Sequence, residues 1–162
     1  MLIALTASGF RLYCRHNQAR HRRLRDSGAK QMRGGSFSLT TSRQMEFIDI
    51  TAQVAKVVAG SGQADGLCCV YNPHTTAGLT INEGADPDVQ IDLLAAFRRM
   101  VPLDHPYRHQ EGNSPAHAMA TLVGSSVTVI VTDGRLLLGT WQKIFFCEFD
   151  GPRTRQLFWK VV

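Results

Sequence analysis

Residues 126–135 read SVTVIVTDGR, and this stretch decides the kind of sheet that the chain can form. Valine recurs at every second position, a period of two that is typical of a β-strand with two distinct faces. Asp133 and Gly134 then form a two-residue turn signal, which returns the chain antiparallel to itself. The stretch therefore predicts a β-hairpin and, with it, an antiparallel sheet.

The pattern extends in both directions from this hairpin. We predict that residues 135–149 form one long strand bent near Gly139 and that residues 153–162 form the last strand. Further expected strands are residues 37–41, 45–50, 66–72 and 79–83, and expected helices are residues 52–59, 86–102 and 114–124. Because the C-terminal strands come as hairpins, the expected fold is α+β: a mainly antiparallel β-sandwich of about seven strands with about three helices.

Charge separates an N-terminal segment from the rest of the chain. Residues 1–35 hold eight basic residues and one acidic residue, whereas residues 36–162 hold ten basic and twelve acidic residues. A folded nucleic-acid-binding domain carries its basic patch on the domain itself, so this distribution argues against nucleic acid as a partner. We expect residues 1–35 to be a basic, disordered extension and residues 36–162 to form one domain.

Composition disfavours two other classes of protein. No apolar run approaches the roughly 20 residues that a membrane-spanning helix needs. The four cysteines form no CxxC pair and no zinc-finger spacing. We interpret them as buried and reduced, which favours a cytoplasmic protein.

Histidines gather in two polar segments that lie between predicted core elements. His74 follows a predicted strand and is flanked by Thr75, whose hydroxyl suits an anion or a water molecule. His109 and His117 lie in the polar stretch 104–117, where a helix start also offers N–H groups to a phosphate. Three imidazoles with an open fourth position fit a catalytic zinc site. The alternative, given equal weight, is that these side chains only hydrogen-bond the loop backbone.

Charged side chains near these segments supply further candidates. Glu83 and Asp104 have no capping role to explain them and are candidates for acid–base catalysis or metal binding. By strand parity Glu148 shares a face with apolar residues, so it must find a partner there or line a pocket. Arg153 and Arg155 share one face of the last strand, where each suits a phosphate, although a salt bridge explains Arg155 equally well.

Taken together, five motifs resemble the YjbQ (UPF0047) family. They occupy residues 72–78, 81–83, 104–117, 138–142 and 148–155, so the resemblance covers the whole chain after the basic extension. It implies an α+β fold that assembles as a homotrimer around a threefold axis. It also implies secondary thiamine-phosphate synthase activity, which joins an aminopyrimidine pyrophosphate to a thiazole phosphate and releases pyrophosphate.

The resemblance and the residue chemistry together assign a role to each candidate. The expected catalytic residues are Glu83, Asp104 and Glu148, the expected substrate-binding residues are Thr75, Asn113, Gln142, Arg153 and Arg155, and the expected metal ligands are His74, His109 and His117. One departure from the family pattern is Ser114-Pro115, where alanine and an acid are more usual. Proline still fits the first turn of a helix.

We therefore expect an enzyme that acts on phosphorylated small molecules, with weak thiamine-phosphate synthase activity. A divalent metal ion, zinc or magnesium, is expected at the three histidines. The alternative is a non-catalytic protein that binds a metal ion or a phosphorylated metabolite. The expected partners are a small phosphorylated molecule and other copies of the chain, with no membrane and no nucleic acid.

Overall fold

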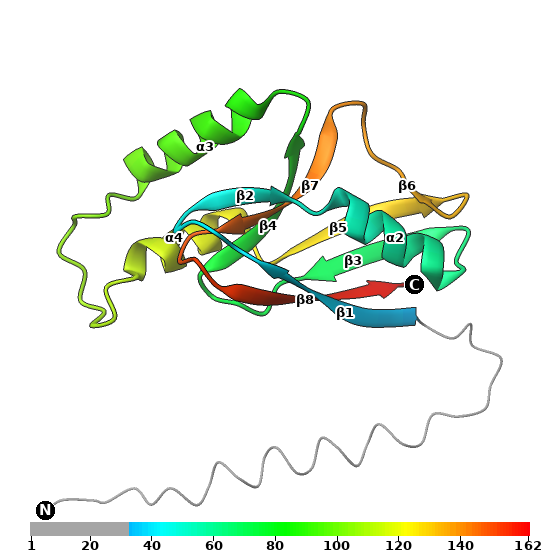
Figure 1. Ribbon diagram of the computed structural model, residues 1–162, viewed down its shortest axis with the longest axis horizontal. Coiled ribbons are helices and arrows are strands. Elements are labelled where there is room, and N and C mark those ends of the chain that lie inside the picture. Colours follow the sequence, from blue (N-terminus) through cyan, green and yellow to red (C-terminus); the bar gives the residue numbers. More distant parts are fainter. Residues whose placement is uncertain (1–32) are drawn as a thin grey trace, which may run out of the picture. The chain divides into compact units, whose positions relative to one another are not determined.

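The structure, a computed structural model, describes residues 33–162, which form eight strands and three helices (Figure 1). In chain order the elements are β1 (Arg33–Thr40), β2 (Glu46–Asp49), α2 (Thr51–Ser61), β3 (Gly66–Tyr71), β4 (Ala77–Glu83), α3 (Pro87–Met100), α4 (Ser114–Val123), β5 (Ser126–Thr132), β6 (Arg135–Leu136), β7 (Gln142–Glu148) and β8 (Thr154–Val161). The expected extension, residues 1–35, lies outside the described residues except for its last three. Those three already belong to β1, so the folded part begins earlier than position 36.

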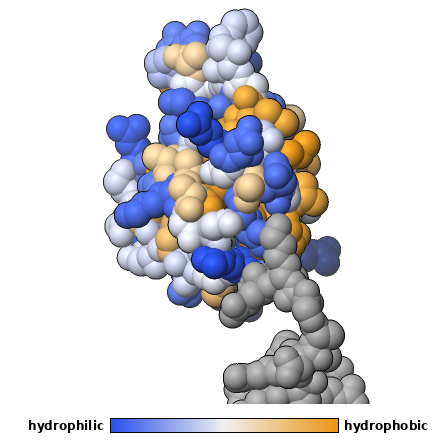
Figure 2. Space-filling view, turned by 90° about the vertical axis from the view of Figure 1, so that its right-hand side faces the viewer, coloured by the Kyte–Doolittle hydropathy of each residue, from blue (hydrophilic) through white to orange (hydrophobic). Residues whose placement is uncertain are grey.

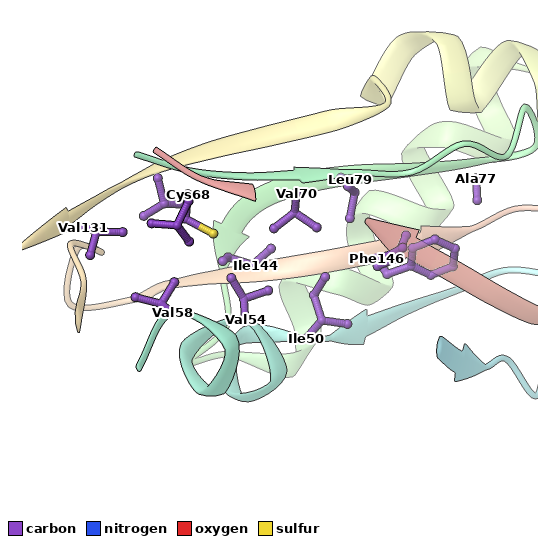
Figure 3. Packing of buried hydrophobic residues seen from close by; sticks show 13 residues of the cluster. Ile50, Val54, Val58, Cys68, Val70, Ala77, Leu79, Val131, Ile144 and Phe146 are labelled. Atoms are coloured by element: carbon purple, nitrogen blue, oxygen red, sulfur yellow. The ribbon is translucent and has the colours of Figure 1, made fainter. Parts of the chain in front are cut away.

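Two antiparallel sheets form the predicted sandwich. The five-stranded sheet has the strand order β1-β8-β3-β5-β6, and the three-stranded sheet has the order β2-β7-β4. Every adjacent pair of strands is antiparallel. The main core lies between the sheets, where Figure 3 shows Val70 of β3 and Ile144 of β7 packed with Val54 of α2. The α+β class and the mainly antiparallel sandwich are confirmed.

β7 is buried on both of its faces. Ile144 and Phe146 belong to the main core, whereas Phe145 and Cys147 belong to a second core that α4 covers. Because side chains alternate across a strand, each step along β7 passes from one core to the other. Glu148 follows the parity of Ile144 and Phe146, and its side chain is fully buried. A carboxylate is therefore placed between the sheets.

The long strand predicted for residues 135–149 is instead two strands in different sheets. β6 pairs with β5 in the five-stranded sheet, and β7 pairs with β4 and β2 in the three-stranded sheet. Between them the chain turns at Gly139, whose N–H donates to the Gln142 side-chain oxygen at 2.8 Å. Gly139 thus marks a crossing between sheets and not a bend within one strand, which raises the strand count to eight.

The helix starts follow local sequence rules in one case and depart from them in two. Asp86 caps α3 as predicted, because its carboxylate accepts a backbone N–H in the first turn. Thr51, the predicted cap of α2, is its first residue, and its hydroxyl accepts the N–H of Ile144 at 2.9 Å. Asn113 precedes α4 but donates its amide N–H to Asp150. No helix in residues 33–162 is long and apolar enough to cross a bilayer.

Candidate functional site

The loop that carries His74 is held by the buried side chain of Asn72. The Asn72 Oδ1 accepts the N–H of His74 at 3.1 Å, and its Nδ2 donates to the carbonyls of His74 and Ala77 at 3.1 and 2.6 Å. The Asn72 backbone N–H donates to Ser125, just after α4. One amide thus satisfies the polar groups of the turn between β3 and β4 and fixes the position of His74.

The His74 ring takes the place of a strand partner. β3 pairs with β8 as far as Tyr71 opposite Phe158, and then turns away. His74 Nε2 lies 3.1 Å from both the N and the O of Gln156, the next outward-facing backbone groups of β8. In one tautomer the Gln156 N–H donates to Nε2, and in the other Nε2–H donates to the Gln156 carbonyl. The imidazole therefore completes the edge that β3 leaves open.

Electrostatics keep this imidazole neutral at pH 7. Burial lowers the pKa of His74 below its usual 6.5, and the positive charge of Arg155 lowers it further. The hydrogen bond with Gln156 and the charge of Glu148 oppose the shift without cancelling it. A neutral imidazole both donates and accepts hydrogen bonds, which suits substrate binding or proton transfer.

The side chains of Arg155 and Glu148 bind each other in an ion pair. Arg155 Nε donates to Glu148 Oε2 at 2.7 Å, Nη2 donates to Oε1, and Nη2 also donates to the Thr76 hydroxyl at 3.0 Å. Two backbone N–H groups, those of Phe149 and Asp150, donate to Glu148 as well. Glu148 is 0% and Arg155 is 5% exposed. The structure therefore places both side chains in a buried ion pair beneath the His74 loop.

A cavity of about 480 Å³ lies above this pair, between the His74 loop and α4. Its lining includes His74, Thr75 and His117, together with Tyr71 and Thr121. We call it the histidine pocket. Among the residues of the described chain that line it, none is Asp, Glu, Lys or Arg. The pocket thus offers imidazoles and hydroxyls but no carboxylate.

His109 lies next to His117 but does not line the histidine pocket. Their ring centroids are 5.5 Å apart at an interplanar angle of 75°, an edge-to-face contact. His109 Nε2 also lies 3.7 Å from a Glu111 carboxylate oxygen on the surface. Within residues 33–162 no group of three or more His, Cys, Asp or Glu side chains is arranged to hold a metal ion. Asp104 lies on the exposed loop before His109.

Asn113 and Arg153 meet at Asp150. Asn113 Nδ2 donates to Asp150 Oδ2 at 3.1 Å, and Arg153 Nη2 donates to the same oxygen at 2.6 Å. This contact ties the start of α4 to the turn between β7 and β8. A second cavity, of about 250 Å³, opens beside it and is lined by Glu111, Asn113 and Asp150. Its two carboxylates make the helix start less favourable to phosphate than the sequence suggested.

Glu83 and Gln142 lie at the other end of β4. The two residues are paired in register, whereas Ala77, at the His74 end of β4, pairs with Glu148. With about 3.3 Å per residue, these ends are roughly 20 Å apart. Glu83 and Gln142 line a third cavity, of about 480 Å³, together with the 65% exposed Trp141. A single chain therefore keeps this group away from the histidine pocket.

Comparison with known proteins decides the family. A family model described as UPF0047 protein YjbQ-like matches residues 35–162. The chain belongs to the YjbQ-like UPF0047 family. It is 49% identical over 128 residues to the UPF0047 protein YugU of Bacillus subtilis (strain 168), a match that covers 78% of this chain and 97% of that one.

Solved structures agree with this membership. A YjbQ/UPF0047 family protein of Clostridium acetobutylicum is 53% identical with a TM-score of 0.77, covering 78% of this chain and 98% of that one. A hypothetical protein of Aeropyrum pernix K1 is 37% identical with a TM-score of 0.76, covering 80% and 98%. These relatives establish the fold and the family.

The sequence predicted which residues line the pocket better than it predicted the hydrogen bonds that hold those residues in place. His74, Thr75 and His117 share one pocket, as their motifs suggested. It missed Asn72, which stands before a proline as turn-forming asparagines often do. It also missed the contacts of Thr76 and Asp150, which lie inside the family motifs. Thr76 accepts from Arg155, which is distant in sequence, and Asp150 accepts from the distant Asn113 and from the nearby Arg153.

Proposed function

We propose that this protein is a cytoplasmic enzyme that acts on phosphorylated small molecules, with weak thiamine-phosphate synthase activity. The observation that carries the proposal is the histidine pocket, where the neutral His74 ring, the Thr75 hydroxyl and His117 line one cavity. Such groups donate hydrogen bonds to phosphate oxygens and develop no competing negative charge. The family resemblance supplies the reaction, in which pyrophosphate leaves the aminopyrimidine carbon as the thiazole nitrogen bonds to it.

The residues that line the histidine pocket and the charged residues outside it have distinct tasks in this reaction. When Nε2 of His74 accepts the Gln156 N–H, Nδ1 carries the ring proton, and this N–H donates a hydrogen bond to an oxygen of the leaving pyrophosphate. Thr75 adds a hydroxyl donor beside it. Arg153, whose side chain is 51% exposed, keeps guanidinium N–H groups for a phosphate while it contacts Asp150. Arg155 acts indirectly, because it holds the loop through Thr76 and its positive charge adds to burial in lowering the pKa of His74, while Glu148 holds Arg155 in place.

The proposal retains a divalent metal ion, zinc or magnesium, at His74, His109 and His117 as a separate claim. As one chain places them, the three imidazoles do not form a ligand group, and Nε2 of His74 is engaged by Gln156. We therefore assign no step of the reaction to the ion. Elemental analysis of the purified protein and of His109→Ala tests the claim. Stoichiometric metal that His109→Ala loses supports it, and a metal-free, active wild type refutes it.

The second candidate is a non-catalytic protein that binds a phosphorylated metabolite. One observation favours it: both oxygens of the buried Glu148 carboxylate are bound by Arg155, so this group is not free to serve as an acid or base. This candidate predicts saturable binding of thiazole phosphate in calorimetry without product formation.

One assay separates the two candidates. Thiamine phosphate formation is measured with wild type, His117→Ala and the control His105→Ala, which removes an exposed histidine from the loop before α4. For an enzyme we expect His117→Ala to lose about 100-fold or more in rate while His105→Ala keeps the wild-type rate. Equal rates in wild type and His117→Ala would end the catalytic role of the pocket.

We also propose that the protein is a homotrimer. On the outer face of the five-stranded sheet, Leu67 is paired with Ile130 and Tyr71 with Phe158, and all four side chains are 42–53% exposed. The two pairs lie on one face with Cys69 between them on β3, and soluble monomers rarely leave several large apolar side chains open on one face. Figure 2 shows hydrophobic residues gathered along one side of the domain. We call these four residues the sheet patch.

A further inference from the structure

The histidine pocket is chemically incomplete within one chain. Proton transfer by an imidazole usually needs a carboxylate that orients the ring or exchanges the proton, and none of the described residues lining this pocket carries one. Glu148 is sealed beneath it by Arg155 and two backbone N–H groups. A carboxylate for His74 or His117 must therefore come from elsewhere.

Glu83, in contrast, carries a carboxylate that has no partner among the described residues. Within residues 33–162 its carboxylate makes no hydrogen bond and no ion pair, whereas its backbone carbonyl accepts the Gln90 side chain of α3 at 2.7 Å. It lines an open cavity with Gln142 and the exposed Trp141. An aromatic ring, an amide and a free carboxylate thus share one exposed end of the three-stranded sheet.

The helix beside Glu83 is α3, and much of its surface is exposed. None of the residues of α3 is buried, and its apolar residues Ile91 and Met100 are 62% and 61% exposed. A helix of this length gains most of its stability from packing of an apolar face. Leu94 and Phe97 hold α3 against the second core, whereas its exposed apolar residues and Trp141 indicate that another polypeptide covers this end.

The histidine pocket has a matching apolar rim. Tyr71 lines the pocket and is also a member of the sheet patch, so a chain that covers the patch reaches the pocket entrance. The carboxylate-bearing end and the pocket end are different surfaces of one chain. A contact between two different surfaces of identical chains repeats from copy to copy, and it forms a ring when the rotation between copies closes.

We infer that a second copy of the chain supplies the missing carboxylate. Each site takes His74 and His117 from one copy and Glu83 from its neighbour, with Trp141 and α3 of that neighbour packed over the pocket entrance. Glu83 then orients an imidazole or exchanges a proton with it. This inference rests on the proposed function for its chemistry, but its geometry is testable without activity.

Mixed oligomers test the shared site. His117→Ala and Glu83→Gln, each inactive alone, are co-expressed with different affinity tags in the full chain, and oligomers carrying both tags are isolated. In a ring of three, one site in three then has both native residues, so roughly a third of the wild-type rate returns. If both residues belonged to one chain, no mixed oligomer would have an intact site and no rate would return. Asp133→Asn, which changes an exposed acid in the turn between β5 and β6, is the matched control for Glu83→Gln.

Cross-linking tests the geometry alone. Glu83→Cys carries one tag and Thr121→Cys, at the histidine pocket, carries another, and a short bismaleimide is added to the mixed oligomer. We expect a doubled-mass product with both tags, absent when either variant is paired with wild type. Cross-linking without wild-type activity would refute the proposed function and keep the contact. Wild-type activity with neither rescue nor cross-link would refute the shared site, as would a monomeric wild type.

Discussion

Arg155 and Glu148 face each other across the space between the two sheets and form a fully buried, two-point ion pair. Their strands, β8 and β7, belong to different sheets. The pair therefore joins the two halves of the sandwich directly below the loop that carries His74. A buried pair of this kind constrains both partners, because neither charge has access to water.

Removal of one partner is expected to be far worse than removal of both. Arg155→Ala leaves the Glu148 carboxylate buried without a countercharge, and we expect a loss of about 3–5 kcal/mol in the free energy of unfolding. The double variant Arg155→Met/Glu148→Leu removes both charges and should recover most of that loss. Urea denaturation measures both. A single variant as stable as wild type would contradict the buried geometry.

The neutral state of His74 makes stability depend on pH. Because the pKa of His74 is lowered in the folded state, the unfolded chain binds more protons near and below the usual 6.5. Stability is therefore complete above that value and falls as pH decreases through it. Thermal unfolding of wild type and His74→Gln between about pH 8 and pH 5 should show a steeper decline for wild type. Parallel curves would show that His74 is not the group responsible.

Gly78 is expected to set the distance between β4 and α4. A methyl group at this position would lie 2.7 Å from Val123 Cγ1 and 3.0 Å from the Gly124 carbonyl oxygen. We expect Gly78→Ala to destabilise the protein by about 1–3 kcal/mol and to displace His117 on α4 from the histidine pocket. Gly78→Ala/Val123→Ala should restore part of the stability. No change in the unfolding midpoint would show that α4 does not pack here as described.

The sheet patch predicts which substitution breaks the assembly. Ile130→Lys places a charge within it, so we expect the mass in light scattering to fall from three chains of 17.9 kDa to one. Gly60→Lys is the control, because a side chain at Gly60 meets open space. A wild type that is already monomeric, or a trimeric Ile130→Lys, would show that this face is not the interface.

Local patterns in the sequence predicted the strand face on which a side chain lies better than they predicted the residue that it contacts. Alternation in residues 142–148 placed Glu148 with Ile144 and Phe146, and the structure confirms that shared face. It did not select between a salt bridge and a phosphate for Arg155, since that outcome depends on how β8 lies relative to β7. The predicted strand over residues 135–149 was wrong for a related reason. Periodicity does not change at Gly139, although the strand partner does.

Because β7 is buried on both sides, it tolerates little change in side-chain size. From Ile144 to Phe149 every side chain is buried, so a substitution at any of these positions alters the packing of one layer or the other. The neighbouring segment 137–141 is exposed or half-exposed and links the two sheets without belonging to either. Engineered labels and short insertions should therefore avoid the six positions that follow Lys143, which remain nearly fixed in size.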